Sequence, residues 1–108
     1  MFRMRPQDAE MFYEEHKGKS FYNNLINFMS SDFAVGLELI APDAITRWRK
    51  LIGPTNSEKA REEAPNSLRA KFGTDGTKNA CHGSDAPATA ERELGFIFSP
   101  KYLRVIHV

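Results

Sequence analysis

The spacing of apolar residues predicts two helices and then a strand in the first 42 residues. A helix that begins at Pro6 and ends near Gly18 has apolar residues at helical spacing, which places Tyr13 on its inner face. A second helix, from Phe21 to Met29, carries one apolar stripe. The period then changes to two, which predicts a strand that ends at Pro42. The apolar positions of this strand are Phe33, Val35, Leu37 and Leu39.

The rest of the chain predicts helices separated by turns. One helix begins at Pro42–Asp43 and is closed by Gly53–Pro54, and residues 55–65, which lack apolar periodicity, are predicted to form a long functional loop. A short helix over residues 66–72, a short strand over residues 79–82 and a last helix from Ala86–Pro87 follow. The residues predicted to face inward from the longer helices are Ala44, Ile45, Trp48, Leu51, Ile52, Ala90, Leu94, Ile97 and Phe98.

Composition limits the kind of protein and the kind of partner. A chain of 108 residues is long enough for one small α/β domain, and no repeat or low-complexity tract interrupts it. The 15 Lys and Arg nearly balance the 14 Asp and Glu, so we expect a small partner and no nucleic acid. No apolar run is long enough for a membrane span or a secretory signal, and Cys81 is the only cysteine. We therefore expect no membrane association and a cytoplasmic location.

The segment from Lys78 to Asp85 carries the residues best suited to chemistry. A carboxylate from Glu93, which helical spacing turns toward the core, could fix the tautomer of His82 and leave one ring nitrogen free to attack a phosphoryl group. Arg49 and Arg69 could bind the transferring oxygens in bidentate fashion.

Each of these residues also has a simpler interpretation. His82 alone would be a turn histidine, Glu93 a solvated helix charge, and the two arginines surface cations. The aromatic residues Tyr13 and Phe21 would be ordinary core residues at helical spacing. The order of the motifs along the chain favours the chemical interpretation of His82, Glu93 and the two arginines. For Tyr13 and Phe21 both interpretations stay open.

Four blocks of sequence closely resemble the nucleoside diphosphate kinase family, over roughly Arg3 to Phe98. They are Leu51-Ile52-Gly53-Pro54-Thr55-Asn56-Ser57, Ser67-Leu68-Arg69-Ala70-Lys71-Phe72-Gly73, Asn79-Ala80-Cys81-His82-Gly83-Ser84-Asp85 and Ala90-Glu91-Arg92-Glu93. The resemblance implies a ferredoxin-like α/β sandwich with an antiparallel sheet. It also implies ping-pong transfer of the γ-phosphate of ATP or another nucleoside triphosphate to a nucleoside diphosphate, with Mg²⁺ carried on the nucleotide and no metal ligand set in the protein.

The resemblance also assigns roles to individual residues. His82 resembles the phosphorylated histidine, Glu93 its orienting carboxylate and Ser84 a supporting hydroxyl. The residues that resemble the nucleotide-binding set are Arg49, Thr55 and Arg69 for the phosphates, Asn79 for the ribose, Phe21 with Leu25 for the base, and Tyr13 near the phosphates.

The chain also departs from the family pattern at both ends. The family's first strand, with its Lys-Pro-Asp motif, and its first helix have no counterpart before Met1, so we expect a partial kinase domain over residues 1–98 and a divergent tail over residues 99–108. The loop from Pro54 to Arg69 resembles that of the divergent members associated with cilia and flagella. Whether the chain is an active enzyme is left open. The alternative is a non-catalytic nucleotide-binding or interaction module of a ciliary or cytoskeletal assembly, and a homo-oligomer or a larger assembly is also expected.

Overall fold

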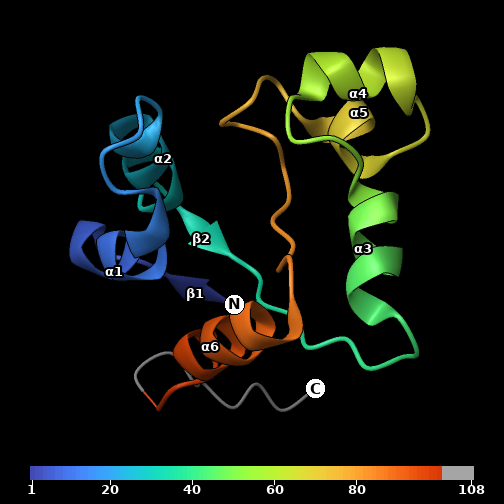
Figure 1. The fold of residues 1–108 in the computed structure, drawn as a ribbon. Helices are drawn as coiled ribbons and strands as arrows, with labels where there is room; N and C mark the ends of the chain where they lie inside the picture. The colour runs from blue at the N-terminus through green and yellow to red at the C-terminus, as the bar shows by residue number, and fades with distance from the viewer. Residues whose placement is uncertain (101–108) are drawn as a thin grey trace. The chain divides into compact units, whose positions relative to one another are not determined.

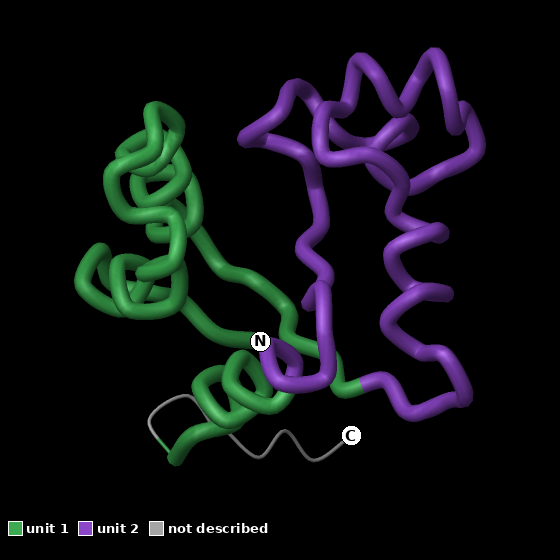
Figure 2. The backbone as a smooth tube through the Cα atoms, viewed as in Figure 1, with its two compact units in different colours: residues 1–38, 91–108 green, residues 39–90 purple. Residues whose placement is uncertain are grey.

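The computed structural model describes residues 1–100, and the chain divides into two units (Figures 1 and 2). Unit 1 comprises residues 1–38 and the described residues from Glu91 onward, and unit 2 comprises residues 39–90. The expected boundary at residues 98–99 is a prediction, because most of the tail lies outside the described residues.

Unit 1 contains a two-stranded antiparallel sheet and helices that pack beside it (Figure 1). Strand β1 (Phe2–Arg3) pairs with strand β2 (Phe33–Ala34), with Phe2 opposite Ala34 and Arg3 opposite Phe33. Along the chain, the two strands are separated by α1 (Pro6–Phe12), the 3₁₀ helix η1 (Glu14–His16) and α2 (Tyr22–Met29). The α/β class, the antiparallel pairing and the second predicted helix are confirmed. The first predicted helix begins at Pro6 as expected, but α1 ends at Phe12 and only the short η1 follows before Gly18.

The start of α1 is fixed by a carboxylate in its first turn. The backbone amide of Arg5 donates to Asp8 Oδ2 at 2.9 Å, and Arg5 Nε donates to the same oxygen at 3.1 Å. Asp8 is buried, so these two donors offset the cost of removing its charge from water. Pro6 occupies the first helical position, where its missing amide leaves no hydrogen bond unmade.

The core of unit 1 is built from aromatic and aliphatic residues of α1, of α2 and of the residues that flank α1. The buried members are Met4, Ala9, Phe12, Tyr13 and Ile26. The ring of Phe12 meets that of Tyr13 edge to face at 4.8 Å and that of Phe96 at 5.6 Å. Tyr13 therefore lies on the inner face, as predicted.

Helix α6 (Pro87–Ile97) begins in unit 2 and continues into unit 1. In unit 1, Ile97 and Phe96 pack against the core, and Arg92 donates to the carbonyl of Phe12 at 3.3 Å. The helix is present as predicted, but one inward residue was wrong: Phe96 meets the core, whereas Phe98 is exposed. Phe98 follows the last helical residue, so helical spacing no longer sets its direction.

Unit 2 consists of short helices joined by well-bonded turns. After α3 (Ala44–Ile52) come α4 (Ser57–Glu63) and α5 (Leu68–Phe72), which pack against each other. Its buried apolar residues are Ile52, Ala60 and Ala70. Leu51, predicted to face inward, is exposed because only the Ile52 side of the last turn of α3 is covered.

The predicted strand from Phe33 to Pro42 was mostly wrong. Only Phe33–Ala34 pair with another strand, because β1 offers just two residues as partners. Beyond Ala34 the strand does not continue, and the apolar set of the prediction is exposed: Phe33, Val35, Leu37 and Leu39 all face solvent, Val35 at 69%. Apolar residues therefore alternate along this part of the sequence, but they are not buried as such alternation usually indicates.

The predicted loop over residues 55–65 was also wrong, because α4 lies within it. Asn56 begins this helix by accepting hydrogen bonds from the amides of Glu58 at 2.9 Å and Lys59 at 3.2 Å. Only Ser57 and Ala60 of the helix are buried, so no apolar stripe marks it. The predicted strand over residues 79–82 is likewise not a strand.

No helix within residues 1–100 combines the length and the apolar content needed to cross a lipid bilayer.

We expect Phe12→Ala to lower the free energy of unfolding by about 3–5 kcal/mol, because it empties the centre of the unit 1 core. Urea unfolding followed by circular dichroism measures this change. Met11→Ala is the matched control, since its side chain is 62% exposed on the same helix and its loss should cost within about 0.5 kcal/mol. Equal losses of unfolding free energy in the two variants would contradict a core centred on Phe12.

Candidate functional site

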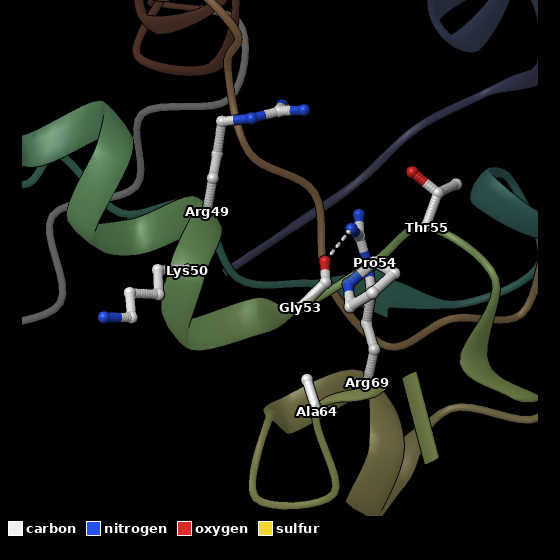
Figure 3. A pocket seen from close by; sticks show the side chains of 7 residues that line it. All are labelled: Arg49, Lys50, Gly53, Pro54, Thr55, Ala64 and Arg69. Atoms are coloured by element: carbon white, nitrogen blue, oxygen red, sulfur yellow. Dashed lines mark hydrogen bonds between the residues drawn. The ribbon is translucent and has the colours of Figure 1, made fainter. Parts of the chain in front are cut away.

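A pocket of about 390 Å³ opens in unit 2 and is lined with positive charge (Figure 3). Its lining residues are Arg49, Lys50, Gly53, Pro54, Thr55, Ala64 and Arg69. Three of them are cations and none is acidic, so the pocket suits an anion. In Figure 3, Arg49 and Lys50 leave α3 in different directions, and Arg69 rises from α5 toward Gly53 and Pro54.

Two of the predicted phosphate binders also hold the backbone around His82. Arg69 Nη2 donates to the carbonyl of Cys81 at 2.9 Å, and Arg49 Nη1 donates to the carbonyl of Gly83 at 2.9 Å. Between them, Trp48 Nε1 donates to the carbonyl of His82 itself at 3.0 Å. Three successive carbonyls are thus fixed by three side chains, two of which line the pocket. The histidine is anchored beside the cations by its own main chain.

These contacts explain why residues 79–82 do not form a strand. A strand partner would need the carbonyls that Arg69, Trp48 and Arg49 occupy. Ala80 has a φ of +72°, which breaks extended geometry just before the histidine. A left-handed conformation costs a residue with a side chain about 1–2 kcal/mol, so the surrounding hydrogen bonds must hold it.

Gly83 allows the closest approach of the histidine segment to α3. A Cβ at this position would lie 2.8 Å from Trp48 Cδ1 and 3.2 Å from Ile52 Cδ1. Ile52 is fully buried, so it has little room to yield. Glycine at this position therefore allows the indole to reach the carbonyl of His82.

Asn79 and Thr55 are brought together through the backbone of the pocket rim. Asn79 Nδ2 donates to the carbonyl of Thr55 at 2.9 Å and to that of Gly76 at 3.3 Å. Arg69 Nη1 donates to the carbonyl of Gly53 at 2.9 Å, so the turn that carries Thr55 is held from two sides. Thr55 lines the pocket, as its predicted role requires.

The segment after His82 adds a hydroxyl and a carboxylate to the same unit. Ser84 is half-buried. A hydrogen bond from the Thr89 hydroxyl, and more weakly the charges of Arg49 and His82, hold the pKa of Asp85 below its ordinary value. Burial raises the pKa of the Cys81 thiol against the opposing charge of Arg69, which agrees with a small filler and not a reactive thiol.

The other predicted site residues belong to unit 1. Glu93 is 4% exposed, so its predicted inward direction is confirmed, and Leu25 packs at the edge of the core. Phe21 is 41% exposed, with Lys19 Nζ 5.8 Å from the centre of its ring. The pairing of Glu93 with His82 is a prediction, because the structure describes the two units separately.

Two residues of the site were not predicted to act there. Trp48 was assigned only to the apolar face of α3, and Lys50 was not assigned at all. A contact between residues 48 and 82 spans 34 positions, and no local pattern reports it. The signal that could have found Lys50 is its position next to Arg49, at the end of a helix that leads into a glycine turn.

Among residues 1–100, no group of three or more His, Cys, Asp or Glu side chains could hold a metal ion. The pocket itself offers guanidinium, ammonium and hydroxyl groups. This donor set fits phosphate oxygens, and it fits Mg²⁺ only where the nucleotide supplies the ligands.

We expect Gly83→Ala to displace the His82–Gly83 peptide from α3 and to cost about 1–3 kcal/mol in overpacking. Trp48 is the only tryptophan, so its fluorescence reports the change directly. Gly95→Ala is the matched control, because a Cβ there meets nothing within 4 Å. An unchanged Trp48 emission spectrum in Gly83→Ala would contradict the contact.

Known proteins are similar to this chain in sequence. A nucleoside diphosphate kinase from Aquifex aeolicus is 52% identical over 99 residues, which is 92% of this chain and 70% of that protein. The rat (Rattus norvegicus) nucleoside diphosphate kinase homolog 7 is 45% identical over 98 residues, which is 91% of this chain but only 25% of the relative.

Solved structures show the same similarity. The crystal structure of the Aquifex enzyme matches with a TM-score of 0.81 at 44% identity, over 95% of this chain and 73% of that one. A Halobacterium salinarum nucleoside diphosphate kinase, solved in complex with CDP, matches with a TM-score of 0.73 at 28% identity, over 100% of this chain and 71% of that one. Residues 1–103 match the family model of nucleoside diphosphate kinase, a family of nucleotide phosphoryl-transfer proteins, and the chain belongs to that family.

Proposed function

We propose that this chain transfers the γ-phosphoryl group of a nucleoside triphosphate to a nucleoside diphosphate through a phosphohistidine at His82. A ring nitrogen of His82 attacks the γ-phosphorus, the bond to the bridging oxygen breaks, and the nucleoside diphosphate leaves. The terminal phosphate oxygen of a second nucleoside diphosphate then attacks the phosphohistidine and regenerates the ring.

One observation carries this proposal: the arginines that line the pocket also bind the carbonyls on both sides of His82. The hydrogen bonds from Arg69 to Cys81 and from Arg49 to Gly83 hold the main chain of His82 beside the arginines of the pocket, which supports a role for its ring as the nucleophile. Such preorganisation is the main contribution that a protein makes to phosphoryl transfer, because the chemistry needs positioning and charge stabilisation more than covalent assistance.

Within unit 2, the remaining residues complete a binding site for the polar part of a nucleotide. Arg49 donates to one backbone carbonyl and has further guanidinium donors for phosphate oxygens, and Arg69 adds its positive charge to the same pocket. The Thr55 hydroxyl adds a donor at the rim of the pocket. The amide nitrogen of Asn79 is already committed to backbone carbonyls, so its oxygen is the group that would accept from a ribose hydroxyl.

Unit 1 would supply the base platform and the orienting carboxylate. Phe21 offers an exposed aromatic face, and stacking on one face tolerates different bases. Leu25 would flank the base, and Tyr13 would contribute its hydroxyl near the phosphates. Glu93 would accept a hydrogen bond from one nitrogen of His82, with Ser84 supporting the site.

Magnesium would arrive on the nucleotide. Mg²⁺ is usually held by one or two carboxylates, several waters and the substrate phosphates, and it would neutralise charge on those phosphates here. The cytoplasmic or ciliary location and the homo-oligomer or larger assembly remain predictions.

A second candidate is a nucleotide-binding or interaction module that does not turn over. The exposed apolar side chains of Phe33, Val35 and Leu37 favour it, because a run of exposed apolar residues often marks a contact with another protein. Nucleotide binding by the folded chain without any phosphohistidine would support this candidate over the enzyme.

We expect incubation with γ-labelled ATP and Mg²⁺ to give an acid-labile phosphoprotein and His82→Ala to abolish the label. Circular dichroism first establishes that both proteins are folded. His107→Ala is the control and should label like the wild type, since that histidine belongs to the tail. A folded wild-type sample that takes up no label would end the enzymatic proposal.

We expect Arg49→Ala to weaken binding of ADP about ten- to hundredfold, because a charge-assisted hydrogen bond to phosphate contributes about 1.5–3 kcal/mol. Isothermal titration calorimetry measures the dissociation constant. Arg47→Ala removes the same charge from the same helix at a position that does not line the pocket, and it should bind ADP nearly as the wild type does. Similar losses in both variants would show that only the general charge of α3 matters.

A further inference from the structure

One more arginine in unit 2 is bonded to backbone, although it lies outside the pocket lining. Arg61, on α4, donates from Nη1 to the carbonyl of Gly73 at 3.0 Å and from Nη2 to that of Thr74 at 3.3 Å. These carbonyls belong to the C-cap of α5 and to the residue after it. The guanidinium thus bridges α4 to the beginning of the segment that leads to His82.

That segment, residues 73–81, is closed by hydrogen bonds of its own. Asp75 Oδ1 accepts from the amides of Thr77 at 2.8 Å and Lys78 at 2.7 Å, and the amide of Thr74 donates to the carbonyl of Lys78 at 2.6 Å. The amides of Lys78 and Thr77 hold the pKa of the Asp75 carboxyl below its ordinary value. The turn is therefore a defined structure that can be moved or held as a whole.

The same turn is connected to two predicted nucleotide-binding residues. The carbonyl of Asp75 accepts from the amide of Ser57 at 3.4 Å, and Asn79, at the end of the turn, reaches back to the carbonyl of Thr55. After Asn79 come Ala80, in its left-handed conformation, and Cys81, held by Arg69. Arg61 secures the start of this segment, and Arg69 secures its end.

We propose that Arg61 is a positioning residue that latches residues 73–79 to α4 and thereby sets Asn79 and Thr55 for the nucleotide. This role rests on the proposed function of the pocket. The simpler alternative is that Arg61 only caps the C-terminal end of α5, where a cation is favourable in any helix. The two differ in one respect: capping alone would not change how the pocket binds a nucleotide.

The test compares Arg61→Gln and Arg61→Lys with Lys59→Gln in the full chain. Lys59 lies on the same helix, is exposed and forms only a surface pair with Glu63 at 3.8 Å, so Lys59→Gln removes the same charge without the latch. Lysine has a single ammonium and cannot bridge two carbonyls in the fixed geometry of a guanidinium, so Arg61→Lys should rescue only part of the effect.

The first readout is hydrogen exchange of the Thr74, Thr77 and Lys78 amides in the free protein. We expect exchange to rise about tenfold in Arg61→Gln and to stay at the wild-type rate in Lys59→Gln, at conditions where both remain folded. Unchanged exchange in Arg61→Gln overturns the latch. This readout needs no nucleotide, so it stands even where the proposed function fails.

The second readout is the dissociation constant for ADP with Mg²⁺. We expect it to rise about five- to tenfold in Arg61→Gln, by less in Arg61→Lys and not in Lys59→Gln. Faster exchange with an unchanged dissociation constant overturns the positioning role and leaves only the cap. A wild-type chain that does not bind ADP overturns the proposed function instead.

If Arg61→Gln fails to fold, Asp75→Asn is tested in its place, because the loss of the Asp75 carboxylate weakens the hydrogen bonds inside the same turn. Asp75→Asn should raise both the amide exchange rates and the dissociation constant for ADP. A dissociation constant that stays at the wild-type value in Asp75→Asn, despite faster exchange, overturns the positioning role.

Discussion

The candidate site depends on the hydrogen bonds that three side chains make to the successive carbonyls of Cys81, His82 and Gly83. Without them, the segment would need a strand partner or water to satisfy the same oxygens, and the left-handed Ala80 would keep only the bonds of Asn79 to hold it. With them, the position of the histidine main chain is set by α3 and α5. The catalytic proposal therefore rests on packing that exists before any nucleotide binds.

The use of arginine for both structure and binding has a physical reason. A guanidinium has five donors in a plane, so Arg69 can bind the carbonyls of Gly53 and Cys81 and still line the pocket. Removing the charge of Arg69 from water is costly, and backbone carbonyls offset part of that cost. The lining of the pocket holds three cations and no acidic residue, so an arriving phosphate would meet positive charge.

Much of the helical framework could be predicted from the sequence, because prolines, glycines and apolar spacing act locally. Of the predicted phosphate binders, the structure brings Arg49, Thr55 and Arg69 to one pocket, while their roles stay predictions. Helix α4 could not be predicted from apolar spacing. It is stabilised by the Asn56 cap and buries only small residues, and neither feature produces an apolar stripe in the sequence. The strand from Phe33 was overextended because alternation reports a possible pleat but not the presence of a partner. The contact of Trp48 with His82 was missed for a related reason: it joins positions that are distant in the chain.

The two units are stabilised in different ways, and the difference suits their proposed roles. Unit 1 has an aromatic core around Phe12, whereas residues 39–90 bury only Ile52, Ala60 and Ala70 among apolar side chains. Unit 2 is instead held by directional bonds from arginine, asparagine, aspartate and tryptophan side chains to its backbone. Apolar packing tolerates small shifts of volume and shape, but a hydrogen bond weakens steeply with angle and distance. A unit held in this way fixes the directions of its cations closely, which is what stabilising the charge of a transferring phosphoryl group requires.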